Sequence, residues 1–158
     1  SYIVPGQKIN IPVGYVAPVI TPSASATAPK QVKAAATHNA QDVDLLARLI
    51  TAEASGQPYQ AKVAVAAVVI NRTTSGTFKN TIKGVIYETI KGYHQFTPVT
   101  NGLINKPAGA DAVKAANAAL SGQDPTKGAL FYFDNTITNK WLLAKPVSIT
   151  IDKLIFAY

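Results

Sequence analysis

Glu53 occupies a position at which the hydrophobic pattern predicts an apolar side chain. It follows Leu45 and Leu49 at intervals of four residues, so a helix would place all three side chains on one inward-facing stripe. Burial disfavours the charged form of a carboxyl group and therefore raises its pKa. A carboxylic acid that stays protonated near neutral pH can act as a general acid. We predict that Glu53 is catalytic; the alternative is a buried structural carboxylate paired with Arg48 or Arg72.

A single buried glutamate restricts the routes to glycoside cleavage. The common routes need two carboxyl groups, about 5–5.5 Å apart in retaining enzymes or about 6.5–9.5 Å apart in inverting ones. Asp134 is the best second candidate, whereas we expect Glu88, close to Lys91, to be a solvated surface group. One glutamate suffices if the substrate supplies the nucleophile. In peptidoglycan the C6 hydroxyl of muramic acid can attack the anomeric carbon, so that one glutamate acts as acid and then as base and leaves a 1,6-anhydro product.

Residues for metal or nucleophilic chemistry are scarce. The sequence contains no cysteine, and its two histidines are His38 and His94. One histidine beyond residue 40 cannot build a two- or three-histidine zinc site, and no G-x-S-x-G motif is present. We therefore expect no metal and no cofactor, and we expect His94 to be a polar loop residue.

The charge balance indicates an anionic partner. Lys and Arg number 15 against 8 Asp and Glu, which gives a net charge of +7. Thirteen of the fifteen cations are Lys, whereas base and phosphate recognition usually depends on Arg. A cell-wall polymer is therefore favoured over nucleic acid, and ordinary solubility is the plain alternative. No window approaches about 18 consecutive apolar residues, so we expect a mature, soluble form without membrane insertion.

The first 40 residues differ in composition from the rest. Residues 4–12, VPGQKINIP, resemble the closing segment of a LysM module, the small peptidoglycan-binding repeat, and we assign 1–16 to the C-terminal remnant of such a module. An ordinary linker is the alternative for this segment. Residues 17–40 are dominated by Ala, Pro, Ser and Thr and are predicted to form a flexible linker. Residues 41–158 remain as one folded unit.

Helix and strand signals in that unit predict an α+β fold, a helical body with a small antiparallel sheet. Asn39 can cap a first helix that carries Glu53 and ends before Gly56 and Pro58. A second helix, about 59–71, is apolar nearly all round, as expected for a central buried helix. Further helices are expected at about 80–88, closed by Gly92, and at 111–120, with Val113, Ala116 and Leu120 facing inward. Strands are expected at 129–133, 147–151 and 154–157, and a loop at 93–99.

Several motifs occur in a recognisable order. They are AEASGQPY at 52–59, VAVAAVVINR at 63–72, NTI at 80–82, QFTPV at 95–99, ALSGQDPTKGALFYF at 119–133 and KW at 140–141. Together they resemble the SleB and CwlJ type cell-wall hydrolases, the spore cortex-lytic enzymes. The resemblance implies that 41–158 is a lysozyme-like, lytic transglycosylase-like catalytic domain with Glu53 as its acid. It also implies activity on peptidoglycan, especially the muramic-δ-lactam cortex of bacterial spores.

The chain departs from the family pattern at three single positions and in the closing motif. The family usually has Arg at Ser55, an acidic residue at Gln57 and Gly at Ala61, and its closing Gly-x-His-x-Phe appears here as DKLIF at 152–156. The missing histidine argues against a role for that position. We expect the changes at Ser55 and Gln57 to affect rim contacts and efficiency and to leave Glu53 untouched.

Further residues are candidates for substrate binding. Gln95 and Phe96 lie in a loop rich in groups that stack or form hydrogen bonds, with a packed loop as the alternative. Phe131 and Tyr132 lie on opposite faces of a strand, and the resemblance favours Tyr132 as the cleft residue.

The remaining candidates are Asn135, Trp141 and Asn71. Trp141 could be a sugar platform or a core anchor. Asn71 could bond near Glu53 or cap a helix.

The resulting prediction is a peptidoglycan lytic transglycosylase that cleaves the bond between N-acetylmuramic acid and N-acetylglucosamine during germination. Its partner would be peptidoglycan glycan strands, and we expect a secreted monomer in the cell wall or spore cortex. An N-acetylmuramoyl-L-alanine amidase is one alternative, against which the shortage of histidine and absence of cysteine count. A non-catalytic wall-binding module with a cationic surface is the other.

Overall fold

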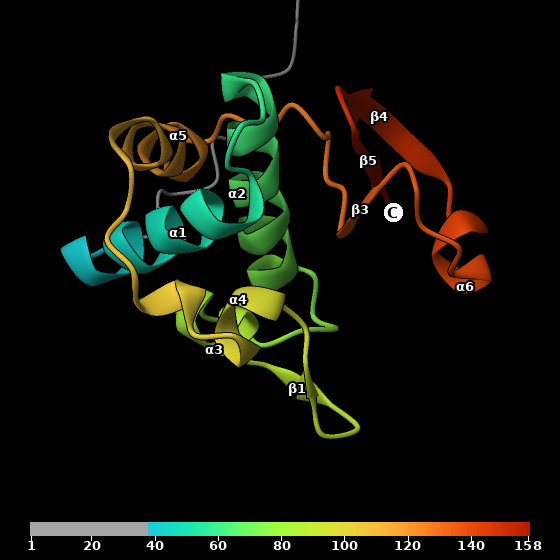
Figure 1. The fold of residues 1–158 in the computed structure, drawn as a ribbon, viewed down its shortest axis with the longest axis horizontal. Coiled ribbons are helices and arrows are strands. Elements are labelled where there is room, and N and C mark those ends of the chain that lie inside the picture. Colours follow the sequence, from blue (N-terminus) through green and yellow to red (C-terminus); the bar gives the residue numbers. More distant parts are fainter. Residues whose placement is uncertain (1–37) are drawn as a thin grey trace, which may run out of the picture. The chain divides into compact units, whose positions relative to one another are not determined.

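The computed structural model describes residues 38–158. The predicted LysM remnant, 1–16, and residues 17–37 of the predicted linker lie outside the described residues. Residues 38–158 form an α+β unit of packed helices and two small antiparallel sheets, the first at residues 89–94 and the second near the C-terminal end of the chain (Figure 1). No helix in this part of the chain is long and apolar enough to cross a membrane.

The elements follow one another in this order. The helices are α1 (Ala40–Glu53), α2 (Tyr59–Thr74), α3 (Ile82–Ile86), α4 (Thr97–Thr100), the 3-10 turn η1 (Leu103–Asn105), α5 (Ala110–Leu120) and α6 (Lys140–Leu143). The strands are β1 (Thr89–Ile90), β2 (Tyr93–His94), β3 (Phe131–Asp134), β4 (Val147–Ile151) and β5 (Leu154–Ala157).

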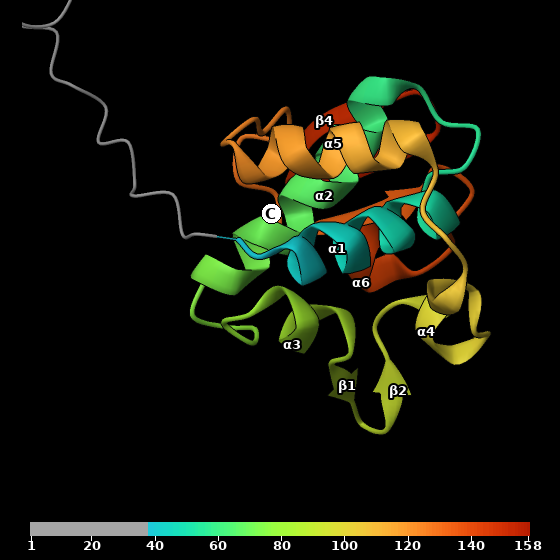
Figure 2. The same ribbon diagram turned by 90° about the vertical axis from the view of Figure 1, so that its left-hand side faces the viewer.

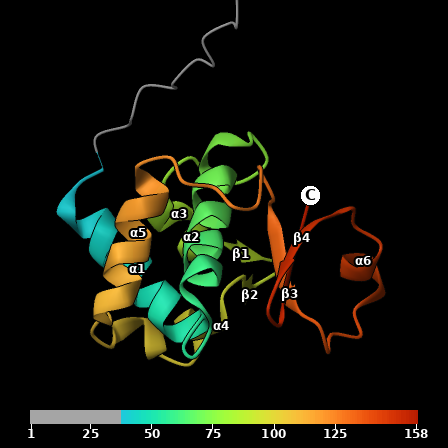
Figure 3. The same cartoon turned by 90° about the horizontal axis from the view of Figure 1, so that it is seen from above.

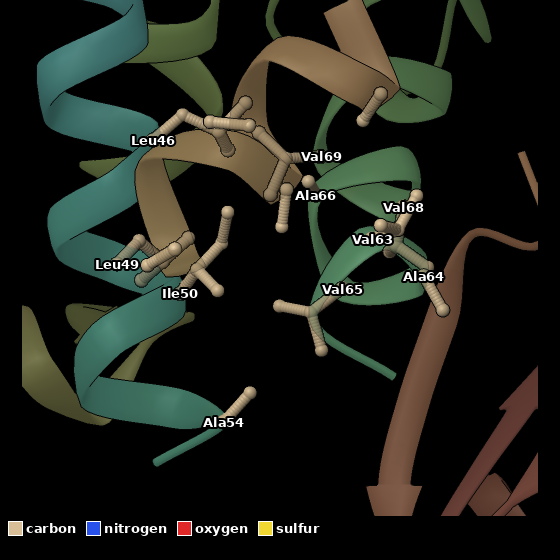
Figure 4. Close-up of a cluster of buried hydrophobic side chains, with 14 of the residues drawn as sticks. Leu46, Leu49, Ile50, Ala54, Val63, Ala64, Val65, Ala66, Val68 and Val69 are labelled. Carbon is tan, nitrogen blue, oxygen red and sulfur yellow. The ribbon is translucent and has the colours of Figure 1, made fainter. Parts of the chain in front are cut away.

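The core forms around α2, which is buried along nearly its whole length. The Asn39 carboxamide oxygen caps α1 by accepting from the Asp42 amide at 2.8 Å, as expected. In Figure 4, Leu46 of α1 lies beside Val69 of α2, and Ile50 of α1 lies toward Val65. Helix α5 packs against both α1 and α2 (Figure 2), and its buried face consists of alanines, which lets the backbones approach closely.

The buried face of α5 agrees with the prediction only in part. Ala116 is buried as expected, whereas Val113 and Leu120, which were also expected to point inward, are only partly buried. The buried positions are Ala112, Ala115, Ala116 and Ala119. Between two helices the small side chains occupy the contact, and the larger ones lie at its margins.

The second sheet has the order β3-β5-β4, and all its pairs are antiparallel. Strands β4 and β5 have the predicted bounds, and their tight turn places Asp152 at φ 52°. Strand β3 begins two residues later than predicted, at Phe131. Tyr132 pairs with Phe156, which is fully buried in the central strand, so the sheet fixes where Tyr132 lies.

The prediction for the segment 80–99 was correct only for the presence of a short helix. The short helix ends at Ile86, and β1 and β2 form a hairpin in which Ile90 pairs with Tyr93. Lys91 and Gly92 both have positive φ, 53° and 82°, which is the geometry of a two-residue hairpin turn. Gly92 therefore turns the hairpin and does not close a helix. The predicted loop at 93–99 contains β2 and the start of α4.

Asp124 organises the loop that leads from α5 into β3. Its Oδ1 accepts from the Thr126 amide at 2.8 Å, and its Oδ2 accepts from the Gly128 amide at 2.7 Å and from Asn71 Nδ2 at 3.0 Å. Desolvation raises the pKa of Asp124, but these hydrogen bonds favour the ionised form and bring the pKa below its ordinary value of 3.8. The loop is thereby attached to α2.

We predict that Asp124→Ala lowers the free energy of unfolding by roughly 2–4 kcal/mol at neutral pH, because hydrogen bonds to a charged group contribute about 1.5–3 kcal/mol each and are not additive. A group with a depressed pKa stabilises the fold above its unfolded pKa and loses this effect as the pH falls through its folded pKa. The difference between wild type and variant, measured by urea denaturation, should therefore shrink below about pH 4.

Asp111→Ala is the matched control. The Asp111 side chain is exposed, and its ion pair with the exposed Lys114, from Oδ1 to Nζ, is long at 3.9 Å and therefore weak. Its effect should stay within about 0.5 kcal/mol. Equal losses in the two variants would contradict the role assigned to Asp124.

Candidate active site

Glu53 is the last residue of α1 and lines a cavity of about 480 Å³. The stripe predicted from the sequence is present, because Leu45 and Leu49 are buried and Glu53 is half-buried one turn further on. The cavity is lined by Glu53, Gln57, Arg72, Gln95, Phe96, Thr97, Tyr132, Phe133, Asp134, Thr136, Ile137, Leu142 and Leu154. The cavity thus receives residues from α1 and α2, from the segment before α4, from the second sheet and from α6.

Two opposed effects set the protonation of Glu53. Burial raises its pKa above the ordinary value of 4.5, and a hydrogen bond donated by the Tyr132 hydroxyl lowers it in part. The same contact, together with burial, raises the pKa of Tyr132 well above its ordinary value, so Tyr132 remains a neutral donor. Glu53 is therefore biased toward the protonated form and keeps a donor ready for its carboxylate.

Asp134 lies in the same cavity in the opposite environment. The Thr136 hydroxyl donates to Asp134 Oδ1 at 2.7 Å and the Thr136 amide donates at 2.9 Å. These bonds lower the pKa of the exposed Asp134 carboxyl. In many active sites, two carboxyl groups whose environments shift their pKa values in opposite directions serve as the acid and the base. Asp134 and Glu53 thus line one cavity, and their environments shift their pKa values in opposite directions.

Arg72 forms a buried wall of the cavity. Its side chain is 6% exposed, and its guanidinium carbon lies 4.7 Å from the ring centroid of Phe78, 5.3 Å from Phe96 and 5.6 Å from Phe131. Arg72 Nε donates to the Leu130 carbonyl at 2.7 Å. Burial lowers the pKa of Arg72, yet a guanidinium stays protonated in proteins. The cation is held by three aromatic rings and the entry to β3.

The alternative of a structurally paired Glu53 gains no support. In the described part of the chain, which contains both arginines and all eight acidic residues, Arg48 pairs with Asp44 at 2.9 Å and no ion pair joins Glu53 to Arg48 or Arg72. Arg48 also donates to the Ile104 carbonyl at 3.0 Å. Glu53 is therefore free of a neutralising cation and open to the cavity.

The cavity brings together Gln95, Phe96 and Tyr132 with Glu53. Phe96 is buried and Gln95 is exposed at the edge. Phe131 is partly buried and lines a neighbouring cavity together with Trp141, so Phe131 and Tyr132 both face hollows.

Asn135 and Asn71 do not line the Glu53 cavity. Asn135 is exposed, lies between the lining residues Asp134 and Thr136, and donates its amide to the Lys153 carbonyl at 2.9 Å. The Asn71 carboxamide donates to Asp124 and, at 3.2 Å, to the Ala129 carbonyl. Asn71 supports the loop that precedes β3.

Glu88 was expected to be a solvated surface group, and this was wrong. It is half-buried, and its Oε2 is buried without a hydrogen-bond partner among the described residues. Glu88 lines the neighbouring cavity with Arg72. No sequence pattern indicated this burial, because the hairpin that begins directly after Glu88 was not predicted. Thr97 was likewise missed as a lining residue, whereas Gln57, which also lines the cavity, was expected to affect rim contacts. Among residues 38–158 no three side chains of His, Cys, Asp or Glu cluster as a metal site would require.

The chain belongs to the cell wall hydrolase family. The family profile, described as Cell Wall Hydrolase, matches residues 56–157. The family predicted from the ordered motifs is thereby confirmed. The matched span begins after Glu53, so the role of Glu53 depends on the geometry of the cavity.

Individual relatives of the chain are named spore cortex-lytic enzymes. The chain is 42% identical over 120 residues to a spore cortex-lytic enzyme of Bacillus cereus, covering 75% of this chain and 45% of the relative. It is 40% identical over 116 residues to that of Bacillus subtilis, covering 73% of this chain and 37% of the relative. The chain thus spans less than half the length of these curated relatives.

A solved structure covers the same region. The catalytic domain of the germination-specific lytic transglycosylase SleB from Bacillus anthracis superposes with a TM-score of 0.71 at 40% identity, covering 77% of this chain and 98% of that chain. The catalytic domain of Bacillus cereus SleB gives a TM-score of 0.70 at 41% identity, covering 78% of this chain and 94% of that chain. The predicted α+β fold class is confirmed.

We predict that the pKa of the Glu53 carboxyl lies above 4.5 and rises further in Tyr132→Phe, because the lost hydrogen bond favoured the ionised form. Carboxyl-carbon NMR of glutamate-labelled protein can measure this, since the whole sequence contains only two glutamates. Glu53→Gln assigns the signals by removing one of them.

Tyr59→Phe is the control, because Tyr59 is exposed and lines neither the Glu53 cavity nor the neighbouring one. This change should leave the pKa of Glu53 unaltered. A Glu53 pKa that falls, or stays constant, in Tyr132→Phe would contradict the assigned contact.

Proposed function

We propose that this chain is a peptidoglycan lytic transglycosylase that cleaves the glycosidic bond between N-acetylmuramic acid and N-acetylglucosamine. The observation that carries the proposal is a half-buried Glu53 whose pKa is raised, open to a cavity and without a cationic partner. The family and the solved SleB catalytic domain support the same reaction class.

Glu53 first acts as the acid. It donates its proton to the glycosidic oxygen, the bond from that oxygen to the anomeric carbon breaks, and the sugar on the far side leaves with a free hydroxyl. The Glu53 carboxylate that results accepts the hydrogen bond from Tyr132. Tyr132 therefore stabilises the charged form that exists only midway through the reaction.

Glu53 then acts as the base. The C6 hydroxyl oxygen of the muramic acid unit bonds to the anomeric carbon, and its proton passes to Glu53, which restores the starting acid. No water enters the product, which is a 1,6-anhydro sugar. Ionised Asp134 in the same cavity favours positive charge developing on the sugar ring, and its exposure keeps this effect modest.

The residues around Glu53 bind the glycan. Gln95 at the cavity edge offers both a donor and an acceptor to sugar hydroxyl and acetamido groups, and Phe96 supplies an apolar floor. Asn135 lies at the rim, where its side chain can reach a glycan outside the cavity. We assign Asn71 to positioning β3, not to sugar binding.

The natural substrate we propose is the cortex peptidoglycan of bacterial spores, which contains muramic-δ-lactam, and the site of action is the spore cortex or cell wall. The relatives named as spore cortex-lytic enzymes motivate this choice. The net charge of +7 suits an anionic polymer. We further propose that the protein is secreted, works as a monomer, and is held near the glycan by a LysM-like segment upstream of residue 17.

Glu53→Gln should reduce the release of anhydro-muropeptides from purified cortex by roughly 10²–10⁴-fold or more, because one group supplies both proton transfers. Mass spectrometry of the digest gives the measurement. Asp111→Asn, an exposed change on α5, serves as the control and should digest cortex at the wild-type rate.

The same digest separates the alternatives. New free L-alanine amino termini and sensitivity to chelators would identify an amidase, and binding without any new products would identify a wall-binding module. Normal product release by Glu53→Gln would refute the proposed mechanism.

A further inference from the structure

A second cavity of about 490 Å³ adjoins the Glu53 cavity. The two share Arg72, Gln95, Tyr132 and Leu142 as lining residues, so they are neighbouring compartments of one cleft. None of the proton transfers at Glu53 uses the second compartment. A polymer substrate, however, extends beyond the bond that is cleaved.

Trp141 is the large aromatic side chain of this compartment. It is 62% exposed, which excludes the role of a core anchor. It lies in α6, set beyond the second sheet (Figure 3), and the Asn139 side chain fixes the start of α6 by accepting from the Trp141 amide at 3.0 Å and the Leu142 amide at 3.3 Å. An exposed indole on a capped turn costs little conformational entropy when a ligand covers it.

The indole is also held by its neighbours. Its centroid lies 5.4 Å from that of Phe131, with the rings perpendicular, and Lys145 Nζ lies 4.3 Å from the Trp141 centroid and 3.8 Å from the Phe131 centroid. Lys145 lies over both rings and is not among the residues that line the cavity. Trp141 lines the cavity and is still 62% exposed, so part of the indole remains available to a ligand.

Polar groups complete the compartment. Glu88 and Asn139 line it beside the aromatic rings, and Glu88 Oε2 has no hydrogen-bond partner among the described residues. An aromatic surface with a few polar groups matches a hexosamine ring, which presents an apolar C–H face and polar hydroxyl and acetamido groups at its edge.

We propose that this compartment is a separate sugar-binding subsite, in which one hexosamine unit of the glycan stacks on Trp141 next to the pair of sugars at Glu53. The identity of the ligand rests on the proposed function, and the location rests on the geometry of Trp141. Occupation of both compartments requires an oligosaccharide longer than a disaccharide, so affinity should depend on chain length.

Trp141 is the single tryptophan of the entire sequence and reports on its own occupancy. We would titrate the full chain carrying Glu53→Gln with glycan tetrasaccharides and disaccharides of alternating N-acetylglucosamine and N-acetylmuramic acid, exciting tryptophan selectively. The tetrasaccharide should give a saturable change in emission at a concentration at least about tenfold lower than the disaccharide.

Calorimetry on the double variant Glu53→Gln, Trp141→Ala should give at least about tenfold weaker tetrasaccharide binding, equivalent to ~1.4 kcal/mol. Trp141→Phe should retain most of the affinity. Leu143→Ala is the matched control, because Leu143 lies on α6, is 53% exposed and lines neither compartment. In the active enzyme, Trp141→Ala should raise KM more than it lowers kcat.

Tetrasaccharide binding that leaves the Trp141 emission unchanged overturns the subsite, as does unaltered affinity in Trp141→Ala or the absence of any binding. Failure of the proposed function is a different result. If the tetrasaccharide binds at Trp141 but the wild-type chain releases no cleaved product, the subsite stands and the transglycosylase does not.

Discussion

The desolvation of the Glu53 carboxyl is the interaction on which the rest of the site depends. It exists because Glu53 ends a helix whose apolar stripe is buried against α2 and α5. The hydrogen bond from Tyr132 of β3 opposes this desolvation. The two effects together leave a carboxyl group that favours its protonated form and has a hydrogen-bond donor for its charge once it is ionised. A fully solvated glutamate would be ionised before the substrate arrived.

The position of Tyr132 is secured from several sides. Central strand β5 pairs with it through Phe156, and the segment that precedes it is attached to the end of α2 by Arg72 and Asn71. Two consecutive residues of α2 therefore fix the strand that carries the partner of Glu53. A disturbance of this attachment would act on catalysis through Tyr132, without touching substrate.

Arg72 also shows how the fold tolerates a buried cation. Burying a charge destabilises the folded state, and each cation–π contact offsets this by about 0.5–2 kcal/mol. Three rings surround Arg72, yet its Nη1 lacks a hydrogen-bond partner within residues 38–158, as does Glu88 Oε2. Unsatisfied buried polar groups are uncommon in proteins. Here they border the two compartments of the cleft, where a substrate rich in hydroxyl groups is expected.

The local features were predictable from the sequence and the long-range ones were not. Apolar periodicity and capping residues predicted α1, α2 and the last two strands. The one polar residue on the apolar stripe of α1 indicated that Glu53 is a candidate site residue. Periodicity contains no information on which residues far apart in the sequence come into contact. Only the structure therefore reveals the contact between Glu53 and Tyr132, the aromatic rings around Arg72 and the supporting role of Asn71. The hairpin at 89–94 was missed because its two strands have only two residues each, too few to display an alternation.

The central claim is that one glutamate and a hydroxyl group of the substrate accomplish the cleavage without water. The most direct test is digestion of purified cortex peptidoglycan by the wild-type chain in water enriched in heavy oxygen, followed by mass spectrometry of the new glycan ends. The account predicts 1,6-anhydro ends that contain no heavy oxygen. Reducing ends that carry one heavy oxygen would contradict it, because water would then have been the nucleophile.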